Sequence, residues 1–226
     1  MRSPHVPLVT GVTAGIVSVN VGLPRDLEWH GKAVRTGIFK RPVRGRVHVG
    51  RLNLAGDGQA DASVHGGPDK AVYLYPSEHY AYWRDLTGAL DWGAFGENLT
   101  TAGLAEEEVR IGDRLRAGTA ELVVTQPRLP CYKLANRLGL PGFEQRFLAS
   151  GRTGFYLRVA EEGEVGEGDP VAVAGRAEAS VSVADVVRAC AAERPDPALL
   201  SRLAALPGLP EGLRRRFGRQ RGGAEA

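Results

Sequence analysis

Short runs of strand-forming residues, separated by glycine turns, recur through the first three quarters of this chain. Each run alternates apolar and polar residues or is rich in β-branched and aromatic ones, as strands are. The runs cover residues 15–19, 46–49, 71–75, 109–115, 121–125, 154–159 and 171–174. The chain also has thirty glycines and fourteen prolines among its 226 residues, which is typical of many tight turns. The pattern predicts a mainly β fold, and a closed barrel or a sandwich would leave few sheet edges exposed.

Two peripheral helices are expected within this β region. Ser77 stands where an N-cap residue would stand, and Gly88 follows the stretch that Ser77 would open. A second short helix is expected over residues 142–150. Both would pack on the outside of the β structure.

The composition changes after Gly175, where three short helices are predicted. Ser182 and Asp185 resemble a capping box, and Asp196 precedes a proline at the first position of the next helix. A third helix is predicted over residues 211–217, followed by a disordered tail. These helices carry no cluster of catalytic residue types, so we expect them to contribute packing or partner contacts.

The expected organisation is a β domain over residues 11–175 and a three-helix module over residues 176–221. A chain that is 43% hydrophobic can build one substantial core with a small appendage. The net charge of +3 suits an anionic ligand as well as nucleic acid. Two cysteines, Cys131 and Cys190, are too few for a disulfide scaffold and fit a reducing compartment. The sequence shows no secretory signal and no long apolar run, so we expect a cytoplasmic protein without a membrane span.

Cys131 lies in the segment Gln126-Pro-Arg-Leu-Pro-Cys-Tyr-Lys133, which places a thiol near two cations. A thiolate is a soft metal ligand and a nucleophile, and cations such as Arg128 and Lys133 stabilise it. The two prolines disfavour a helix interior or a central strand. The segment therefore predicts a reactive or metal-binding thiol on a stiff loop, and a buried structural cysteine is the alternative.

Three further segments could bind an anion or a heterocycle. In His65-Gly-Gly-Pro-Asp-Lys70 the glycines let backbone N–H groups approach a ligand, although an ordinary glycine turn has the same pattern. In Phe95-Gly-Glu-Asn-Leu99 the amide of Asn98 suits a heterocycle edge, and a turn with a solvated Glu97 is the alternative. Segment 36–40 brings a hydroxyl near a cation and could hold phosphate or be a solvated strand end.

A basic cluster near the C-terminus is formed by Arg214–Arg216 with Arg219 and Arg221. Such a cluster is either an electrostatic footprint for nucleic acid or a solvated helix face. No RNA- or DNA-binding motif accompanies it, and the sequence has no Walker A loop, HExxH or CxxC motif. Cys190 falls on the apolar face of a predicted helix, so we interpret it as a core residue.

Together these segments resemble the YiiM-like subgroup of MOSC domain proteins. The resemblance rests on four motifs in order: 65–75 continuing to 78–80, Phe95–Leu99, Ile111–Asp113 and Gln126–Lys133. The similarity runs from about residue 15 to residue 174, and the three-helix end matches the extra C-terminal module of that subgroup. The resemblance therefore covers most of the chain.

The resemblance implies a MOSC-type closed β-barrel that binds a molybdenum cofactor (molybdenum with molybdopterin) in a positively charged cleft. Cys131 would be the protein ligand to molybdenum, and Cys131 and His65 would be the catalytic residues. The residues expected around the cofactor or substrate are Lys40, Asp69, Lys70, Phe95, Glu97, Asn98, Arg128 and Lys133.

Known members of this subgroup reduce N-hydroxylated bases such as 6-hydroxylaminopurine, so the resemblance implies reduction of such compounds to the parent amine. The sequence has no flavin, haem or iron–sulfur motif, so electrons would come from a separate flavin-type reductase. Two other functions stay open. One is a sulfur carrier with a persulfide on Cys131, and the other is a barrel module that binds nucleic acid.

Overall fold

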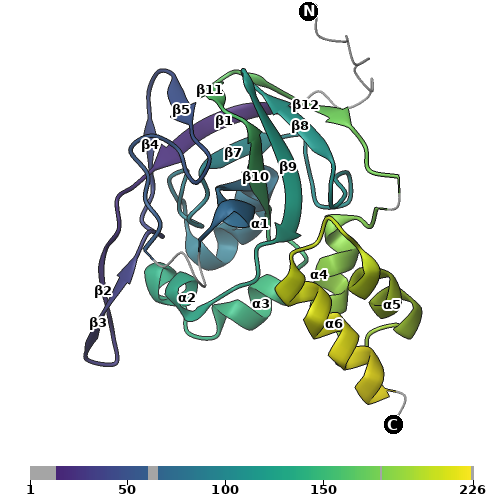
Figure 1. The fold of residues 1–226 in the computed structure, drawn as a ribbon. Coiled ribbons are helices and arrows are strands. Elements are labelled where there is room, and N and C mark those ends of the chain that lie inside the picture. The colour runs from purple at the N-terminus through teal and green to yellow at the C-terminus, as the bar shows by residue number, and fades with distance from the viewer. Residues whose placement is uncertain (1–13, 61–65, 179, 225–226) are drawn as a thin grey trace, which may run out of the picture.

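The computed structural model describes residues 14–60, 66–178 and 180–224, and its centre is a closed β-barrel with most helices at one end (Figure 1). The barrel strands are β1 (Ala14–Val21), β6 (Val72–Pro76), β7 (Leu99–Ala102), β8 (Arg114–Ala117), β9 (Ala120–Pro127), β10 (Phe155–Glu161) and β12 (Pro170–Gly175). They follow the order β12-β8-β9-β10-β6-β7-β1, and β1 pairs back with β12 to close the barrel. Strands β6 and β7 are parallel, so the barrel is mixed. The predicted barrel is confirmed.

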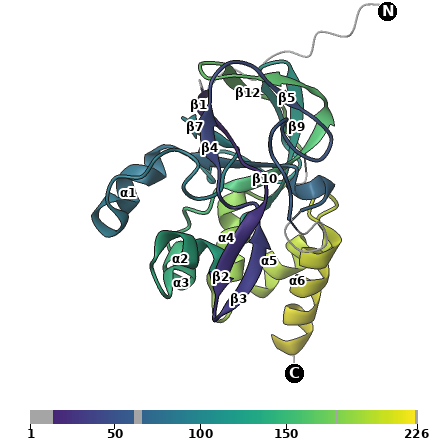
Figure 2. The same cartoon turned by 90° about the vertical axis from the view of Figure 1, so that its left-hand side faces the viewer.

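Five shorter strands lie around this barrel. Strand β4 (Arg41–Val43) pairs with β1, and β5 (Val47–Val49) pairs with β11 (Gly163–Val165). Strands β2 (Arg25–Trp29) and β3 (Lys32–Thr36) form a hairpin that projects from the barrel beside α2 (Figure 2). This hairpin was not predicted from the sequence.

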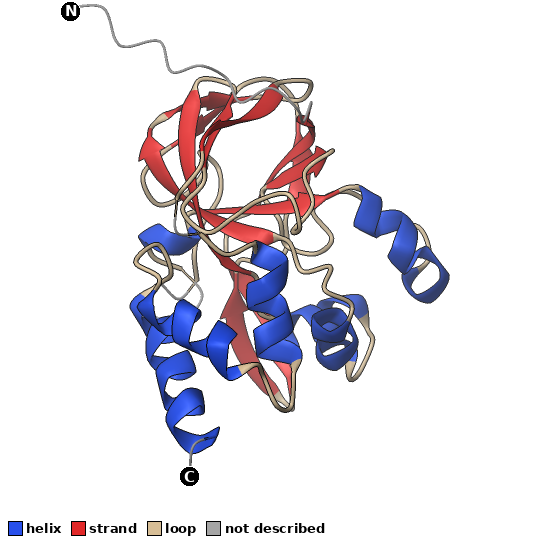
Figure 3. Ribbon diagram, turned by 90° about the vertical axis from the view of Figure 1, so that its right-hand side faces the viewer, coloured by secondary structure: helices blue, strands red, loops and turns tan. Residues whose placement is uncertain are grey.

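Most of the helices lie at one end of the barrel, and α1 projects from its side (Figure 3). They are the 3₁₀ helix η1 (Pro68–Lys70) and the α-helices α1 (Glu78–Thr87), α2 (Tyr132–Leu138), α3 (Phe143–Ala149), α4 (Val183–Ala191), α5 (Pro197–Ala205) and α6 (Glu211–Ala224). Among the described residues, no helix combines the length and the apolar character that crossing a membrane requires.

Two buried clusters hold the fold together. The larger one fills the barrel and continues into the C-terminal helices, where Val186, Leu203 and Phe217 belong to it. The smaller one is aromatic and packs α1 and α3 against the outside of β6. In it, the ring of Tyr75 stacks on Phe95 at 4.6 Å and the phenol accepts a hydrogen bond from an indole N–H. Strand β6 is therefore buried on both faces, and the smaller cluster places the segment around residue 95.

Local signals correctly located the start of two C-terminal helices. The hydroxyl of Ser182 accepts a hydrogen bond from the backbone N–H of Asp185 at 3.0 Å, as a capping residue does. The carboxylate of Asp196 accepts one from the N–H of Ala198 at 2.9 Å. The predicted cap at Ser77 is only partly right, because its side chain makes no capping hydrogen bond.

Two local predictions are wrong. Residues 109–113 are not a strand, because Gly112 has φ of 90° and the buried Asp113 accepts the N–H of Arg110 to form a turn. The tail is not disordered from residue 218, because α6 continues to Ala224. The apolar anchor of that helix is Phe217, which is fully buried against the core.

Candidate functional site

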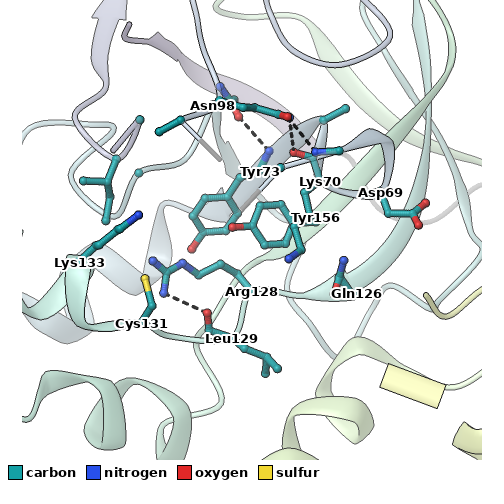
Figure 4. A pocket seen from close by; sticks show the side chains of 18 of the residues that line it. Asp69, Lys70, Tyr73, Asn98, Gln126, Arg128, Leu129, Cys131, Lys133 and Tyr156 are labelled. Atoms are coloured by element: carbon teal, nitrogen blue, oxygen red, sulfur yellow. Dashed lines mark hydrogen bonds between the residues drawn. The ribbon is translucent and has the colours of Figure 1, made fainter. Parts of the chain in front are cut away.

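The motifs of the sequence analysis meet around one cavity of about 640 Å³ at the helical end of the barrel (Figure 4). The cavity is lined by the segment after β3, by η1, by the loop between β9 and α2, and by the start of α6. Of the predicted site residues, those lining it are Lys40, Asp69, Lys70, Phe95, Asn98, Arg128, Cys131 and Lys133. Residues far apart in sequence, such as Lys40 and Lys133, therefore line one cavity.

Cys131 is the N-cap residue of α2 and ends the loop that follows β9. Its backbone is extended, with φ of −141° and ψ of 161°, as is usual for an N-cap residue. The sulfur lies between the side chains of Arg128 and Lys133 at the cavity (Figure 4). The thiol is free and partly exposed, so the alternative of a buried structural cysteine is wrong.

Arg128 places a buried positive charge beside this sulfur. Its side chain is 4% exposed and lies over the rings of Phe147 and Tyr73, with centroid distances of 5.5 and 5.9 Å. Within the described part of the chain, no carboxylate forms an ion pair with it. Burial lowers its pKa, but the neighbouring phenols and the thiol of Cys131 outweigh that effect and raise it. A buried guanidinium without a carboxylate is costly unless an anion binds there.

Two lysines and one aspartate complete the polar rim. Lys133 is 7% exposed, and its ammonium donates to the backbone carbonyl of Arg35 at 3.4 Å. The ammonium of Lys70 lies 6.0 Å from the ring centre of Tyr156. Asp69 forms a partly exposed ion pair with Arg158 at 3.3 Å, so its charge faces outward. The cavity wall near the thiol is therefore cationic.

Asp57 organises the opposite wall, although no sequence motif had pointed to it. Its carboxylate accepts from the ammonium of Lys40 at 2.5 Å, from the N–H of Gly22 at 3.0 Å and from the amide of Asn98 at 2.8 Å. Burial lowers the pKa of Lys40, and the charge of Asp57 opposes that shift. The only sequence signal was the Gly-Asp-Gly turn at 56–58, which looks like any other turn.

Asn98 is held on both sides by the protein. Besides its bond to Asp57, its side-chain oxygen accepts from the N–H of Tyr73 at 3.0 Å (Figure 4). The amide edge that suited a heterocycle is therefore largely engaged in linking β6 to the turn at residue 57. Asn98 positions this wall.

Glu97 lies behind the cavity wall and does not line it. The side chain is fully buried, and its carboxylate accepts from Tyr80 at 2.5 Å, Gly93 at 2.8 Å, Thr100 at 2.9 Å and Phe95 at 3.1 Å. Burial raises the pKa of Glu97, and this effect outweighs the hydrogen bonds, which lower it. The alternative of a solvated Glu97 is wrong, and the expected contact with a ligand is replaced by a positioning role for the loop that carries Phe95 and Asn98.

Glycines form close contacts in the remaining wall. A Cβ on Gly37 would lie 2.5 Å from the carbonyl oxygen of Gly58, so the two backbone segments can approach this closely only because residue 37 has no side chain. Gly67 has φ of 87° and donates its N–H to Gln59 at 2.8 Å just before η1. His65, predicted to be catalytic, lies outside the described residues.

The C-terminal module also contributes to the cavity. Pro210, Gly212 and Leu213, at the start of α6, line it. Leu213 is 9% exposed and belongs to the main core. The module therefore supplies the expected packing and, in addition, part of the cavity wall. Only the tertiary structure brings the start of α6 to the loop that carries Cys131.

Two segments of the chain match known protein families. Residues 61–172 match the MOSC domain, and residues 181–221 match the YiiM-like three-α-helix domain. The chain is 49% identical over 169 residues to the uncharacterized protein YflK of Bacillus subtilis, which covers 74% of this chain and 76% of that protein. The chain belongs to the MOSC family. Its C-terminal helices place it with the YiiM-like proteins.

Further relatives agree with this assignment. Protein YiiM of Escherichia coli is 40% identical over 145 residues, covering 62% of this chain and 65% of that protein. The crystal structure of YiiM from Geobacillus stearothermophilus superposes with a TM-score of 0.76 at 36% identity, covering 92% of this chain and 99% of that chain. A protein of Gibberella moniliformis named reductase is 35% identical over 185 residues, and this chain spans 32% of its length. The predicted family and fold are confirmed.

Proposed function

We propose that this protein is a molybdenum cofactor-dependent oxidoreductase that reduces N-hydroxylated nucleobases, such as 6-hydroxylaminopurine, to the parent amine. The observation that carries the proposal is the thiol of Cys131, which opens into a cavity beside the buried guanidinium of Arg128. Membership of the MOSC family and a homologue named reductase support it.

The residues of the cavity fit a cofactor of this kind. In the described part of the chain, no three His, Cys, Asp or Glu side chains gather to bind a metal ion. A metal bound at Cys131 would therefore take most of its ligands from an organic group. Arg128, Lys133 and Lys70 offer charge for the phosphate of that group, because hydrogen bonds between ionised partners are the stronger ones. The glycines in the cavity wall have no side chains, which leaves room for the organic group.

The residues would divide the work as follows. The cofactor, when bound, supplies two-electron chemistry and an acceptor for oxygen. The thiolate of Cys131 would serve as a soft ligand to the metal, and Arg128 and Lys133 lie beside it. Tyr73 has a pKa raised well above its ordinary value by burial, so its phenol stays neutral and donates to the carbonyl of Thr153 at 2.7 Å. The rigid wall of Asn98 and Asp57 would orient the substrate.

The balanced reaction needs an electron donor outside this chain. Conversion of an N-hydroxylated base to the amine consumes two electrons and two protons, breaks the N–O bond and releases water. We propose a separate flavin-type reductase as the donor. Both cysteines are free, which agrees with a cytoplasmic setting, where disulfides are rare.

The test compares two cysteine variants of protein purified from a host that makes molybdenum cofactor. Wild type should contain molybdenum and pterin and convert 6-hydroxylaminopurine to adenine with a chemical reductant. Cys131→Ser should abolish turnover per bound molybdenum, because a hydroxyl is a hard and weakly acidic replacement. Cys190→Ser is the matched control, since Cys190 is buried in the core and burial raises the pKa of its thiol. It should keep turnover at some cost in stability.

Other outcomes would favour the other functions. Cyanide-labile sulfur on Cys131 without molybdenum would point to a sulfur carrier. Salt-sensitive RNA binding without molybdenum, pterin or turnover would point to a nucleic-acid-binding module. Near-normal turnover in Cys131→Ser would remove the metal-ligand role.

A further inference from the structure

A second cavity, of about 660 Å³, lies on the other side of the segment 38–40. We refer to it as the arginine groove, because Arg25 of β2, Arg41 of β4 and Arg137 of α2 all line it. Lys40 lines both cavities, but its ammonium is bonded to Asp57 and so is committed to the first one. The sequence motifs did not include this groove.

The three guanidinium groups line one groove. Among the residues that the structure describes, none of the three forms an ion pair, and Asp91 is the one acidic residue that lines the groove. Burial lowers the pKa of Arg137, the charge of Glu97 opposes that shift, and the charges of Arg25 and Arg41 add to it. Neighbouring positive charges favour the binding of an anion between them.

Two of the arginines, Arg25 and Arg137, are also held in place before any ligand binds. The guanidinium of Arg25 lies 3.6 Å from the ring centre of Phe39, and that of Arg137 lies 5.3 Å from it. Arg137 donates to the backbone carbonyls of Ile38 and, at 3.4 Å, of Lys40. Stacking on the ring keeps the in-plane N–H groups of Arg25 available for a planar or tetrahedral oxyanion, whereas Arg137 uses two of its N–H groups on backbone carbonyls and contributes mainly its charge.

The rest of the groove is apolar. Leu90, Trp92, Ala94 and Leu138 line it. Its volume lies within the range of about 300–1,000 Å³ that small-molecule sites occupy, which is more than a free phosphate ion fills. The combination of a cationic end and an apolar wall suits an ester with an organic body.

We propose that the arginine groove binds a phosphate monoester of nucleotide size, with the phosphate at Arg25, Arg41 and Arg137 and the organic body against Trp92 and Leu90. The site is separate from the cavity of Cys131, yet Arg137 lies in the helix that Cys131 caps. Segment 38–40 lines both cavities. A ligand in the groove would therefore restrain the wall that holds Lys40.

The probes are AMP, adenosine and inorganic phosphate, titrated into the full-length protein by calorimetry at low salt. AMP should bind saturably, adenosine should not bind, and inorganic phosphate should bind more weakly than AMP. Raising the salt to about 0.5 M should weaken AMP binding, since it screens the guanidinium charges. Fluorescence should report the same event, because Trp92 lines the groove and is one of three tryptophans.

Variants separate this groove from the cationic cavity beside Cys131. Arg25→Gln and Arg41→Gln should each weaken AMP binding about tenfold or more, the loss of one charge-assisted hydrogen bond. Arg44→Gln is the matched control, since Arg44 is exposed and lies outside the groove, and it should bind as wild type does. Arg128→Gln should also retain AMP binding.

Two results would overturn the proposal. One is the absence of saturable AMP binding by wild-type protein at low salt, which would leave the groove to an acidic segment of a protein partner. The other is AMP binding that Arg128→Gln abolishes and that Arg25→Gln and Arg41→Gln leave intact, since the ligand would then lie in the first cavity.

Discussion

Replacing Asp57 by asparagine tests the wall that supports the candidate site. The carboxylate is 4% exposed and is the counter-ion of Lys40, whose side chain is 8% exposed. Asparagine preserves the volume, but it removes the charge and puts an N–H₂ group where one acceptor oxygen was. The ammonium of Lys40 would then be buried without a compensating charge.

The expected cost follows from the burial of both partners. Removing one member of a buried ion pair costs about 3–5 kcal/mol. For a chain of this length, each kcal/mol lowers the melting temperature by about 2–4 °C, so we expect a decrease of about 6–20 °C. Lys40→Met should cost less, because Asp57 keeps its bonds to Gly22 and Asn98.

The destabilisation of Asp57→Asn should depend on pH. Burial already lowers the pKa of Lys40 in the folded state below its ordinary value of 10.5, and losing Asp57 lowers it further. At a pH between the pKa of Lys40 in the folded variant and its ordinary value in the unfolded chain, the unfolded chain binds more protons than the folded one. The stability of the variant therefore rises with pH in this range. The gap to wild type should therefore narrow from neutral to alkaline pH.

The assay is urea denaturation of wild type, both single variants and the double variant. The double variant should lose less stability than the sum of the two single losses, because it leaves no unpaired buried charge. Asp26→Asn is the control, since Asp26 pairs with Arg35 on the exposed hairpin, and it should stay within about 0.5 kcal/mol of wild type. Asp57→Asn within about 1 kcal/mol of wild type, or strictly additive single effects, would refute the reasoning.

Three further predictions concern the surroundings of the site. Glu97→Gln should cost about 1–3 kcal/mol, because the amide N–H₂ of glutamine would face a backbone N–H donor. Since burial raises the pKa of Glu97 in the folded state, the stability advantage of wild type over this variant should fall as pH rises through that pKa. A stability difference that stays unchanged across that pH range would contradict the pKa shift. Gly154→Ala should cost about 1–3 kcal/mol by thermal melting, because φ is 63° and the added Cβ would clash with the carbonyl of Leu74; an unchanged melting temperature would contradict it. Removal of residues 176–226 should lower the content of bound pterin or cause aggregation, because α6 lines the cavity and shares the main core; a soluble truncated protein with wild-type pterin content would contradict it.

The amino-acid sequence by itself determined the local features of this protein. The caps at Ser182 and Asp196 and most of the strands follow from side chains that act within a few residues. The loop that carries Cys131 was also predictable, because proline restricts the backbone wherever it occurs. The four motifs were sufficient to identify the family before the arrangement of any of them was known.

Only the tertiary structure decided what these motifs contact. Asp57 is the counter-ion of Lys40, and Glu97 lies behind the cavity wall, because their partners come from other segments of the chain. The start of α6 joined the cavity of Cys131, and three arginines from separate elements formed the groove beside it. Such contacts depend on strand register and on packing between distant segments, which the local pattern of a sequence does not specify. The types of functional group were therefore predictable, whereas their partners and exposure were not.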